Sequence, residues 1–87
     1  MSTNKSPEAR RRSLLATLFF AQMGAATVRE LVREMELVHN IATSGDQVRG
    51  DLTWLQEQGF CQFAQDMAQI TERGRDVARH SAPWPGE

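Results

Sequence analysis

The sequence has little of what most enzymes and secreted domains use. Its 87 residues include one cysteine, Cys61, which excludes an internal disulfide and leaves no cysteine-based zinc site. The two histidines, His39 and His80, fall at predicted helix ends, without metal-ligand spacing to Cys61 or to a carboxylate pair. No phosphate-cradling glycine loop, nucleophile elbow or zinc-protease motif is present. We therefore expect no enzymatic activity, no metal and no cofactor, and we interpret Cys61 as a small core residue.

An excess of positive charge is also missing. Ten Lys and Arg residues stand against 11 Asp and Glu residues, a formal net charge of −1. A domain dedicated to nucleic acid usually has a basic surplus, so any DNA-binding interpretation depends on how the charges are distributed. The length predicts one small domain, and 40% apolar with 24% charged residues is ordinary for a soluble globular fold.

No apolar run is long enough to span a bilayer. The run Leu14–Ala21 does follow three consecutive arginines and precede small residues, which is the outline of a secretory signal. We prefer a buried first helix with a basic start. Ser6 and Pro7 suit the beginning of a helix, and cleavage near Ala26 would remove a third of an already small chain.

The stretch from Ser44 to Gly59 organises the chain. Ser44 and Gln47 have the spacing of a capping box, which marks a helix start, and Gly59 supplies a left-handed stop. Between them, apolar residues recur at helical spacing and predict one buried face, made by Val48, Leu52 and Leu55. Two short strands follow, 60–64 and 67–70, around a tight turn at Gln65 and Asp66. A helix that ends on glycine and runs into a hairpin is typical of a winged helix-turn-helix.

The remaining segments fit the same architecture. A first helix is predicted over about 7–22, and a second from a capping box at Thr27 and Glu30 to near His39 and Asn40, with Ile41 filling the core after it. A short closing helix is predicted after Thr71, within 71–79, and Gly74 should weaken it modestly. The predicted fold class is α+β: three helices, a two-stranded hairpin wing and a short C-terminal helix. The chain is predicted to divide into a disordered segment 1–5, a winged-helix domain 6–80 and an extended tail 81–87. In this tail, Trp84 either folds back on the domain or anchors a partner, and we prefer folding back.

The segments Asp46–Gly59 and Ile70–Ala78 together resemble winged-helix proteins with a helix, Leu-x-x-Gly, hairpin, Leu/Ile-Thr-x-x-Gly signature. Among these the chain is most similar to a family of short proteins from Mu-like transposable phages and prophages, which share the run Asp-Gln-Val-Arg-x-x-Leu-x-Trp-Leu and a Pro/Gly-containing tail. The resemblance covers roughly Ser13 to Gly86. It implies a small phage DNA-binding or regulatory protein, active in the cytoplasm of the bacterial host.

Two functions from different classes remain open. In the first, the chain is a sequence-specific DNA-binding regulator, working as a homodimer, whose third predicted helix enters the major groove. The predicted base contacts are Gln47, Arg49 and Thr53, and the predicted phosphate contacts are Arg10, Arg11, Arg12, Arg73 and Arg75. The arginines near position 11 oppose the helix dipole, so they serve either a partner or solubility.

The second function is a protein-binding winged helix, docking on a host or phage protein. It follows from charge: between Asp46 and Gln58, three carboxylates, including that of Asp51, stand against Arg49 alone, a net of −2, and Asp66 adds another at the wing tip. The predicted protein-binding face comprises Asp46, Trp54 and Glu57. Gly50, inside the same helix, either admits a close partner surface or makes room for a packed neighbour, which we prefer.

Overall fold

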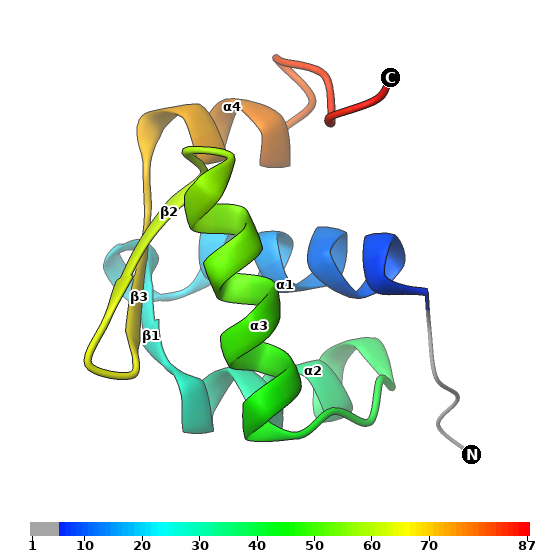
Figure 1. Cartoon of the computed structure of the whole chain (residues 1–87), viewed down its shortest axis with the longest axis vertical. Helices are drawn as coiled ribbons and strands as arrows, with labels where there is room; N and C mark the ends of the chain where they lie inside the picture. The colour runs from blue at the N-terminus through cyan, green and yellow to red at the C-terminus, as the bar shows by residue number, and fades with distance from the viewer. Residues whose placement is uncertain (1–5) are drawn as a thin grey trace.

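A computed structural model describes residues 6–87 of the chain as an α+β winged helix. In chain order its elements are α1 (Pro7–Phe20), the 3-10 turn η1 (Gln22–Gly24), β1 (Ala25–Thr27), α2 (Val28–His39), α3 (Gly45–Glu57), β2 (Cys61–Ala64), β3 (Met67–Ile70) and α4 (Glu72–Ala78). In Figure 1, α3 lies in front of α1, α2 lies below, and the sheet and α4 close the left side and the top. The predicted fold class is confirmed. The predicted disorder of 1–5 lies outside the described residues.

The helix starts follow from side chains that cap the free backbone amides. Ser6, Thr27, Ser44 and Thr71 each accept a hydrogen bond from the backbone N–H three residues later. At Thr27 and Ser44 the residue at the third helical position also binds back to the cap amide, so both predicted capping boxes are confirmed. These local interactions fix the helix boundaries before any tertiary contact forms.

The helix ends follow from residues that leave the helical region of backbone space. Asn40 ends α2 with a left-handed φ of 55°, and Gly59 follows α3 with a φ of +82°. The first helix stops two residues short of the predicted position 22. There the chain enters a sharp corner in which Met23 has a φ of 58°. This corner redirects the chain into a strand.

The sheet has three antiparallel strands in the order β1-β3-β2. The predicted hairpin is confirmed: Cys61 pairs with Ile70, and Phe63 with Ala68. The strand β1 adds a third member, because Ala26 pairs with Ala68 on the other edge of β3. Sequence patterning predicted only a break there, since three small residues are too few to show an alternating pattern.

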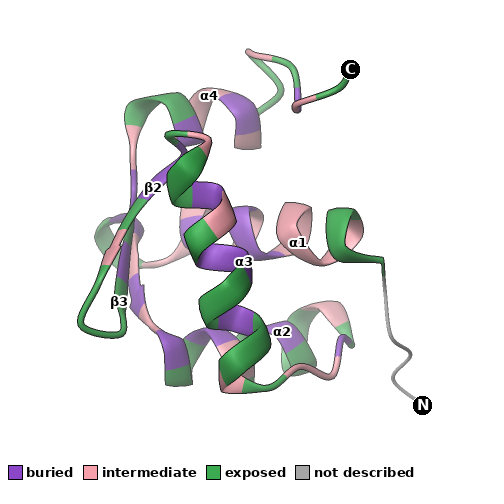
Figure 2. Ribbon diagram, in the orientation of Figure 1, coloured by how far each residue is buried: buried purple, intermediate pink, exposed green. Residues whose placement is uncertain are grey.

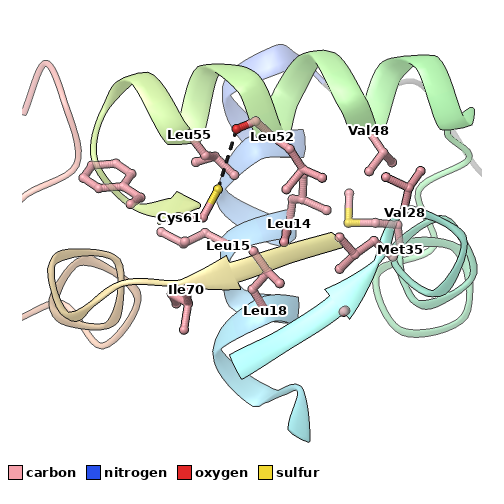
Figure 3. Close-up of a cluster of buried hydrophobic side chains, with 14 of the residues drawn as sticks. Leu14, Leu15, Leu18, Val28, Met35, Val48, Leu52, Leu55, Cys61 and Ile70 are labelled. Carbon is pink, nitrogen blue, oxygen red and sulfur yellow. Dashed lines mark hydrogen bonds between the residues drawn. The ribbon is translucent and has the colours of Figure 1, made fainter. Parts of the chain in front are cut away.

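The core lies between the three long helices and the inner face of the sheet (Figure 3). The predicted inward residues Val48, Leu52 and Leu55 are at most 1% exposed, and Ile41 is 2% exposed, so all four predictions are confirmed. Other large contributions come from α1 and α2, namely Leu14, Leu15, Leu18, Leu31 and Met35. Full burial of one such side chain stabilises the fold by roughly 1.5–3 kcal/mol.

Gly74 is required by packing rather than merely tolerated in α4. A Cβ atom at this position would lie 2.1 Å from the carbonyl oxygen of Phe60. The same oxygen accepts a hydrogen bond from the Thr71 amide at 3.0 Å. The glycine therefore lets the start of α4 approach the backbone that follows α3, which outweighs its cost in helix propensity.

The tail folds back on the domain, as predicted for Trp84. Its side chain is buried, with ring centroids 5.6 Å from Trp54 and 5.9 Å from Phe60. The Arg12 guanidinium lies 4.9 Å from the Trp84 ring centre on the same cluster. Trp84 thus closes the end of the core between α1 and α4.

Candidate functional site

The outer face of α3, beside the wing, is exposed and mostly polar. Figure 2 shows the exposed stripe that runs along this helix. Its exposed residues are Asp46, Gln47, Arg49, Gly50, Thr53, Gln56 and Glu57. The preference for a packed neighbour at Gly50 is wrong, because nothing within residues 6–87 lies within 4 Å of the position a Cβ would take. The middle of α3 is therefore open to close approach from outside.

Arg49 joins α3 to the tip of the wing. Its guanidinium donates two hydrogen bonds to the Asp66 carboxylate, from Nε and Nη2, both at 3.0 Å, and a third from Nη1 to Asp46 at 3.1 Å. The hydrogen bond to Asp66 raises the pKa of Arg49, and the same bond lowers the pKa of Asp66. Because both side chains are exposed, solvent screens the pair and it contributes little to stability. It positions the arginine without locking it.

Thr53 lies one turn after Arg49 on the same face of α3, and Gln47 is exposed two residues before Arg49, in the first turn of the helix. The Gln47 Oε1 accepts from the Ser44 amide at 3.3 Å and from the Thr43 hydroxyl at 3.1 Å, so its amide nitrogen faces outward with two donors to offer. The Thr53 hydroxyl donates to the Arg49 carbonyl at 2.9 Å and keeps its acceptor capacity. The structure thus places Arg49 and Thr53 next to each other on one face of α3 and Gln47 beside the Ser44 cap in its first turn. Whether they contact DNA stays a prediction.

Asp51 departs from the predicted charge distribution. It was counted on the outer face of α3, and this is wrong: Asp51 is 2% exposed. Its carboxylate accepts from Arg10 Nε at 2.7 Å and Nη2 at 3.1 Å, and from Arg11 Nε at 3.1 Å. Asp51 lies one turn from both Val48 and Leu55, so it falls on the inner flank of α3. There it contacts the guanidinium groups of Arg10 and Arg11 from α1. Without Asp51, the outer face of α3 has a net charge of −1, from Asp46 and Glu57 against Arg49.

Three of the predicted phosphate contacts have partners within the chain. Arg10 and Arg11 bind Asp51, with side chains only 16% and 26% exposed. Arg12 forms ion pairs with Glu8 and Glu87 and stacks on Trp84. Figure 1 places the start of α1 and the wing on opposite sides of α3, so these arginines do not lie beside the wing.

Trp54, predicted for a protein-binding face, is half-buried. It packs between the Arg11 guanidinium, 4.6 Å from its ring centre, and the Trp84 ring. The other two residues of that face, Asp46 and Glu57, are exposed. The two acidic residues of this predicted face are therefore exposed, whereas Trp54 packs against the tail.

The two arginines of α4 sit at the far end of α3 from the wing tip. Arg73 is exposed, and its guanidinium lies 5.8 Å from the Phe60 ring centre. Arg75 is half-buried and packs against the backbone at Gly24. Arg73 remains available to a partner along the wing, and Arg75 is partly committed to the corner after α1.

Sequence reasoning missed Arg29 as a residue of this surface. It is exposed at the start of α2 and lines a shallow hollow of about 350 Å³ with Arg49, Gln65 and Asp66. Within residues 6–87 it forms no ion pair. Its position just after the Thr27 cap was visible in the sequence, but its proximity to the wing tip depends on the pairing of β1 with β3.

The described residues offer no alternative chemical centre. Within 6–87 no three His, Cys, Asp or Glu side chains are arranged to hold a metal ion. Cys61 is buried, its thiol donates to the Leu52 carbonyl at 3.6 Å, and burial raises its pKa to about 11. The His39 ring hydrogen-bonds the Thr17 hydroxyl at 3.0 Å. In the same range of residues, no helix combines the length and apolarity needed to cross a bilayer.

The comparison with solved structures found a match, whereas the two comparisons of sequence did not. Neither a protein-family model nor a curated protein matches the sequence. The crystal structure of Bacillus subtilis PadR matches with a TM-score of 0.62 at 21% sequence identity. The match covers 98% of this chain and 50% of the PadR chain, so the chain spans half the length of that protein. The chain therefore shares the winged-helix fold of PadR.

Proposed function

We propose that this chain is a DNA-binding winged-helix protein, in which α3 enters the major groove and the β2–β3 hairpin lies along the neighbouring backbone. The observation that carries the proposal is the open polar face of α3, with Gly50 at its centre and Arg49 held toward the wing tip. A helix with exposed hydrogen-bonding side chains and a gap in its middle fits the width of the major groove. The resemblance to short proteins of Mu-like phages extends the proposal to a phage or prophage transcription regulator in the bacterial cytoplasm.

The proposed base contacts are Gln47, Arg49 and Thr53, all exposed on α3, with Arg49 and Thr53 one turn apart and Gln47 in the first turn. Arg49 would bind guanine through two donors, and the Gln47 amide would reach an adjacent base edge. The structure supports a change in the phosphate contacts. Arg10 and Arg11 are engaged by Asp51, so we assign the backbone contacts to Arg29 beside the wing tip and to Arg73 on α4.

The exposed carboxylates set the strength of this binding. Asp46 and Asp66 hold Arg49 in the free protein and would lie close to DNA phosphates in the complex. Because exposed ion pairs are weak, DNA can displace these carboxylates from Arg49, but their negative charge then opposes the phosphates. We expect moderate affinity that falls steeply with salt.

A salt series tests the proposal directly. Fluorescence anisotropy with labelled fragments of mixed sequence should show binding at about 50 mM salt, and log affinity should fall with log salt with a slope of about −2 for the two assigned phosphate contacts. Arg49→Ala should reduce the preference among sequences by about 1–3 kcal/mol per guanine contact. Absence of binding to any duplex at about 50 mM salt, with an intact fold by circular dichroism, would overturn the proposal.

A second candidate function is supported by the same carboxylates. Asp46 and Asp66 pair with Arg49, and Glu57 is exposed two turns further along α3. The three carboxylates make the surface formed by α3 and the wing acidic, which fits a basic protein partner. One variant gives opposite results for the two functions. Asp66→Asn removes a charge that repels DNA, so DNA affinity should rise about two- to fivefold, whereas capture of a basic protein should weaken.

The control for this variant is Glu36→Gln, which makes the same change in charge on the exposed side of α2. It should leave either kind of binding unchanged within about twofold. Charge reversal of both Asp46 and Glu57 to Lys completes the set. If a captured protein partner is retained after this reversal, the acidic face is not its docking site.

A further inference from the structure

The end of α1 and the corner after it expose large apolar side chains that the core does not use. Phe20 and Met23 are each 83% exposed, and Val38, on the last turn of α2, is 65% exposed. All three line one groove of about 750 Å³ between α1, β1 and α2, whose floor includes the small residues Ala21 and Ala25. Single exposed apolar residues are common, but a contiguous patch around a hollow marks an interaction surface.

The local backbone holds these side chains outward. Met23 has a φ of 58°, a left-handed conformation that costs a non-glycine residue about 1 kcal/mol or more. Its carbonyl accepts a hydrogen bond from the Gln69 side chain at 2.9 Å, which fixes the corner to β3. The Phe20 ring packs edge-on against Phe19, with centroids 5.1 Å apart. The projecting residues are therefore preorganised, and little flexibility is lost when they are covered.

We infer that this groove is the interface through which two copies of the chain form a two-fold symmetric dimer. The surface has both parts of such a contact: the projecting Phe20 and Met23, and a hollow with small side chains beside them. In a two-fold arrangement each protomer's Phe20 enters the other's groove, so one patch serves as both ridge and socket. This inference does not depend on the proposed DNA binding.

The charges at the edge of the groove support a second copy as the occupant. Arg33 and Glu34 both line it, both are exposed, and neither forms an ion pair within residues 6–87. Across a two-fold axis the Arg33 of one protomer faces the Glu34 of the other, so the dimer contains this pair of opposite charges twice. A partner of one predominant charge would meet repulsion from one of them.

The area of the patch sets the expected strength of the dimer. The three apolar side chains offer roughly 400 Å² per protomer, about half of the ~800 Å² that each partner buries in a standard interface. The charged edge contributes the rest. We expect a reversible dimer with a dissociation constant on the order of 1–100 µM. No residue of α3 or of the β2–β3 hairpin lines the groove, so the outer face of α3 stays exposed in each protomer of the dimer.

Sedimentation velocity of the full chain from about 1 µM to about 500 µM tests the inference. The sedimentation coefficient should rise from the monomer to the dimer value. Phe20→Glu should raise the dissociation constant at least about tenfold, and the high exposure of Phe20 keeps this variant folded, which circular dichroism checks. The matched control is Leu37→Glu, at a residue 68% exposed but outside the groove, which should dimerise like the unaltered chain.

A charge exchange identifies the contact between protomers. Arg33→Glu alone should weaken the dimer about fivefold, and Arg33→Glu combined with Glu34→Arg should restore it to within about twofold. The inference is overturned if the chain stays monomeric to about 500 µM. It is also overturned if Phe20→Glu dimerises as tightly as the unaltered chain, or if Leu37→Glu disrupts the dimer as strongly as Phe20→Glu.

Discussion

The Asp51→Asn substitution tests whether a buried charge fastens α1 to α3. Asp51 accepts three hydrogen bonds from Arg10 and Arg11 at 2.7–3.1 Å, and it is 2% exposed. The amide keeps one acceptor oxygen but loses the charge and brings a donor toward two guanidinium groups. A hydrogen bond to a charged group contributes about 1.5–3 kcal/mol, and breaking a buried pair typically costs about 3–5 kcal/mol.

The expected loss lies at the lower end of that range. Arg10 and Arg11 are 16% and 26% exposed, so both can turn toward water once the carboxylate is gone. We therefore expect Asp51→Asn to lower the free energy of unfolding by about 2–4 kcal/mol. A domain of this size has a total stability of roughly 4–13 kcal/mol. The melting temperature should fall by about 8–32 °C, at ~4–8 °C for each kcal/mol.

Urea unfolding followed by circular dichroism and tryptophan fluorescence measures this loss. The control is Asp46→Asn on the same helix, whose side chain is 97% exposed and which should cost at most about 1 kcal/mol. A double-mutant cycle of Asp51→Asn with Arg10→Met should give a coupling of at least about 1 kcal/mol. A loss below about 1 kcal/mol for Asp51→Asn, or no coupling, would refute the role assigned to this ion pair.

Three further predictions concern single side chains. Gly50→Ala should stabilise the fold by about 1 kcal/mol in urea unfolding, because its Cβ meets nothing within residues 6–87. The same substitution should weaken DNA binding measured by anisotropy. Unchanged DNA affinity would contradict close approach at this position. Arg49→Ala should raise the pKa of Asp66 toward its ordinary value in an NMR titration. In the unaltered chain the lowered pKa stabilises the fold above the ordinary pKa, and this stabilisation is lost on acidification. The variant should therefore lose less stability on acidification than the unaltered chain. The Cys61 thiol, with a pKa of about 11, should resist iodoacetamide at neutral pH and react in denaturant; rapid labelling of the folded protein would contradict its burial.

The arginines at the start of α1 show that a charged residue can have an intramolecular partner far away in the sequence. Three positive charges near a helix N-terminus oppose the helix dipole, and this suggested a partner or solubility as their reason. The structure gives an intramolecular reason, because Arg10 and Arg11 neutralise Asp51 and Arg12 packs on Trp84. Contacts between residues some 40 positions apart leave no signal in either segment alone.

Much of the fold follows from the sequence because its signals are local. Capping side chains at Thr27 and Ser44, a glycine stop at Gly59 and apolar spacing from Val48 to Leu55 act within one or two helical turns. The hairpin register follows from its short turn at Gln65 and Asp66, both with positive φ. These features determined the three helices, the wing and the exposed face of α3.

Only the tertiary structure decided how the segments meet. It added β1 to the sheet, turned Asp51 inward, required Gly74 for the approach of α4, and joined Arg49 to Asp66 across 17 positions of sequence. It also left Phe20 outside the core, although this residue belongs to the apolar run Leu14–Ala21. The amino-acid order determined where helices and strands begin and end, because capping and turns are short-range. Which charges are free for a partner was decided by long-range pairing, which is a property of the folded chain.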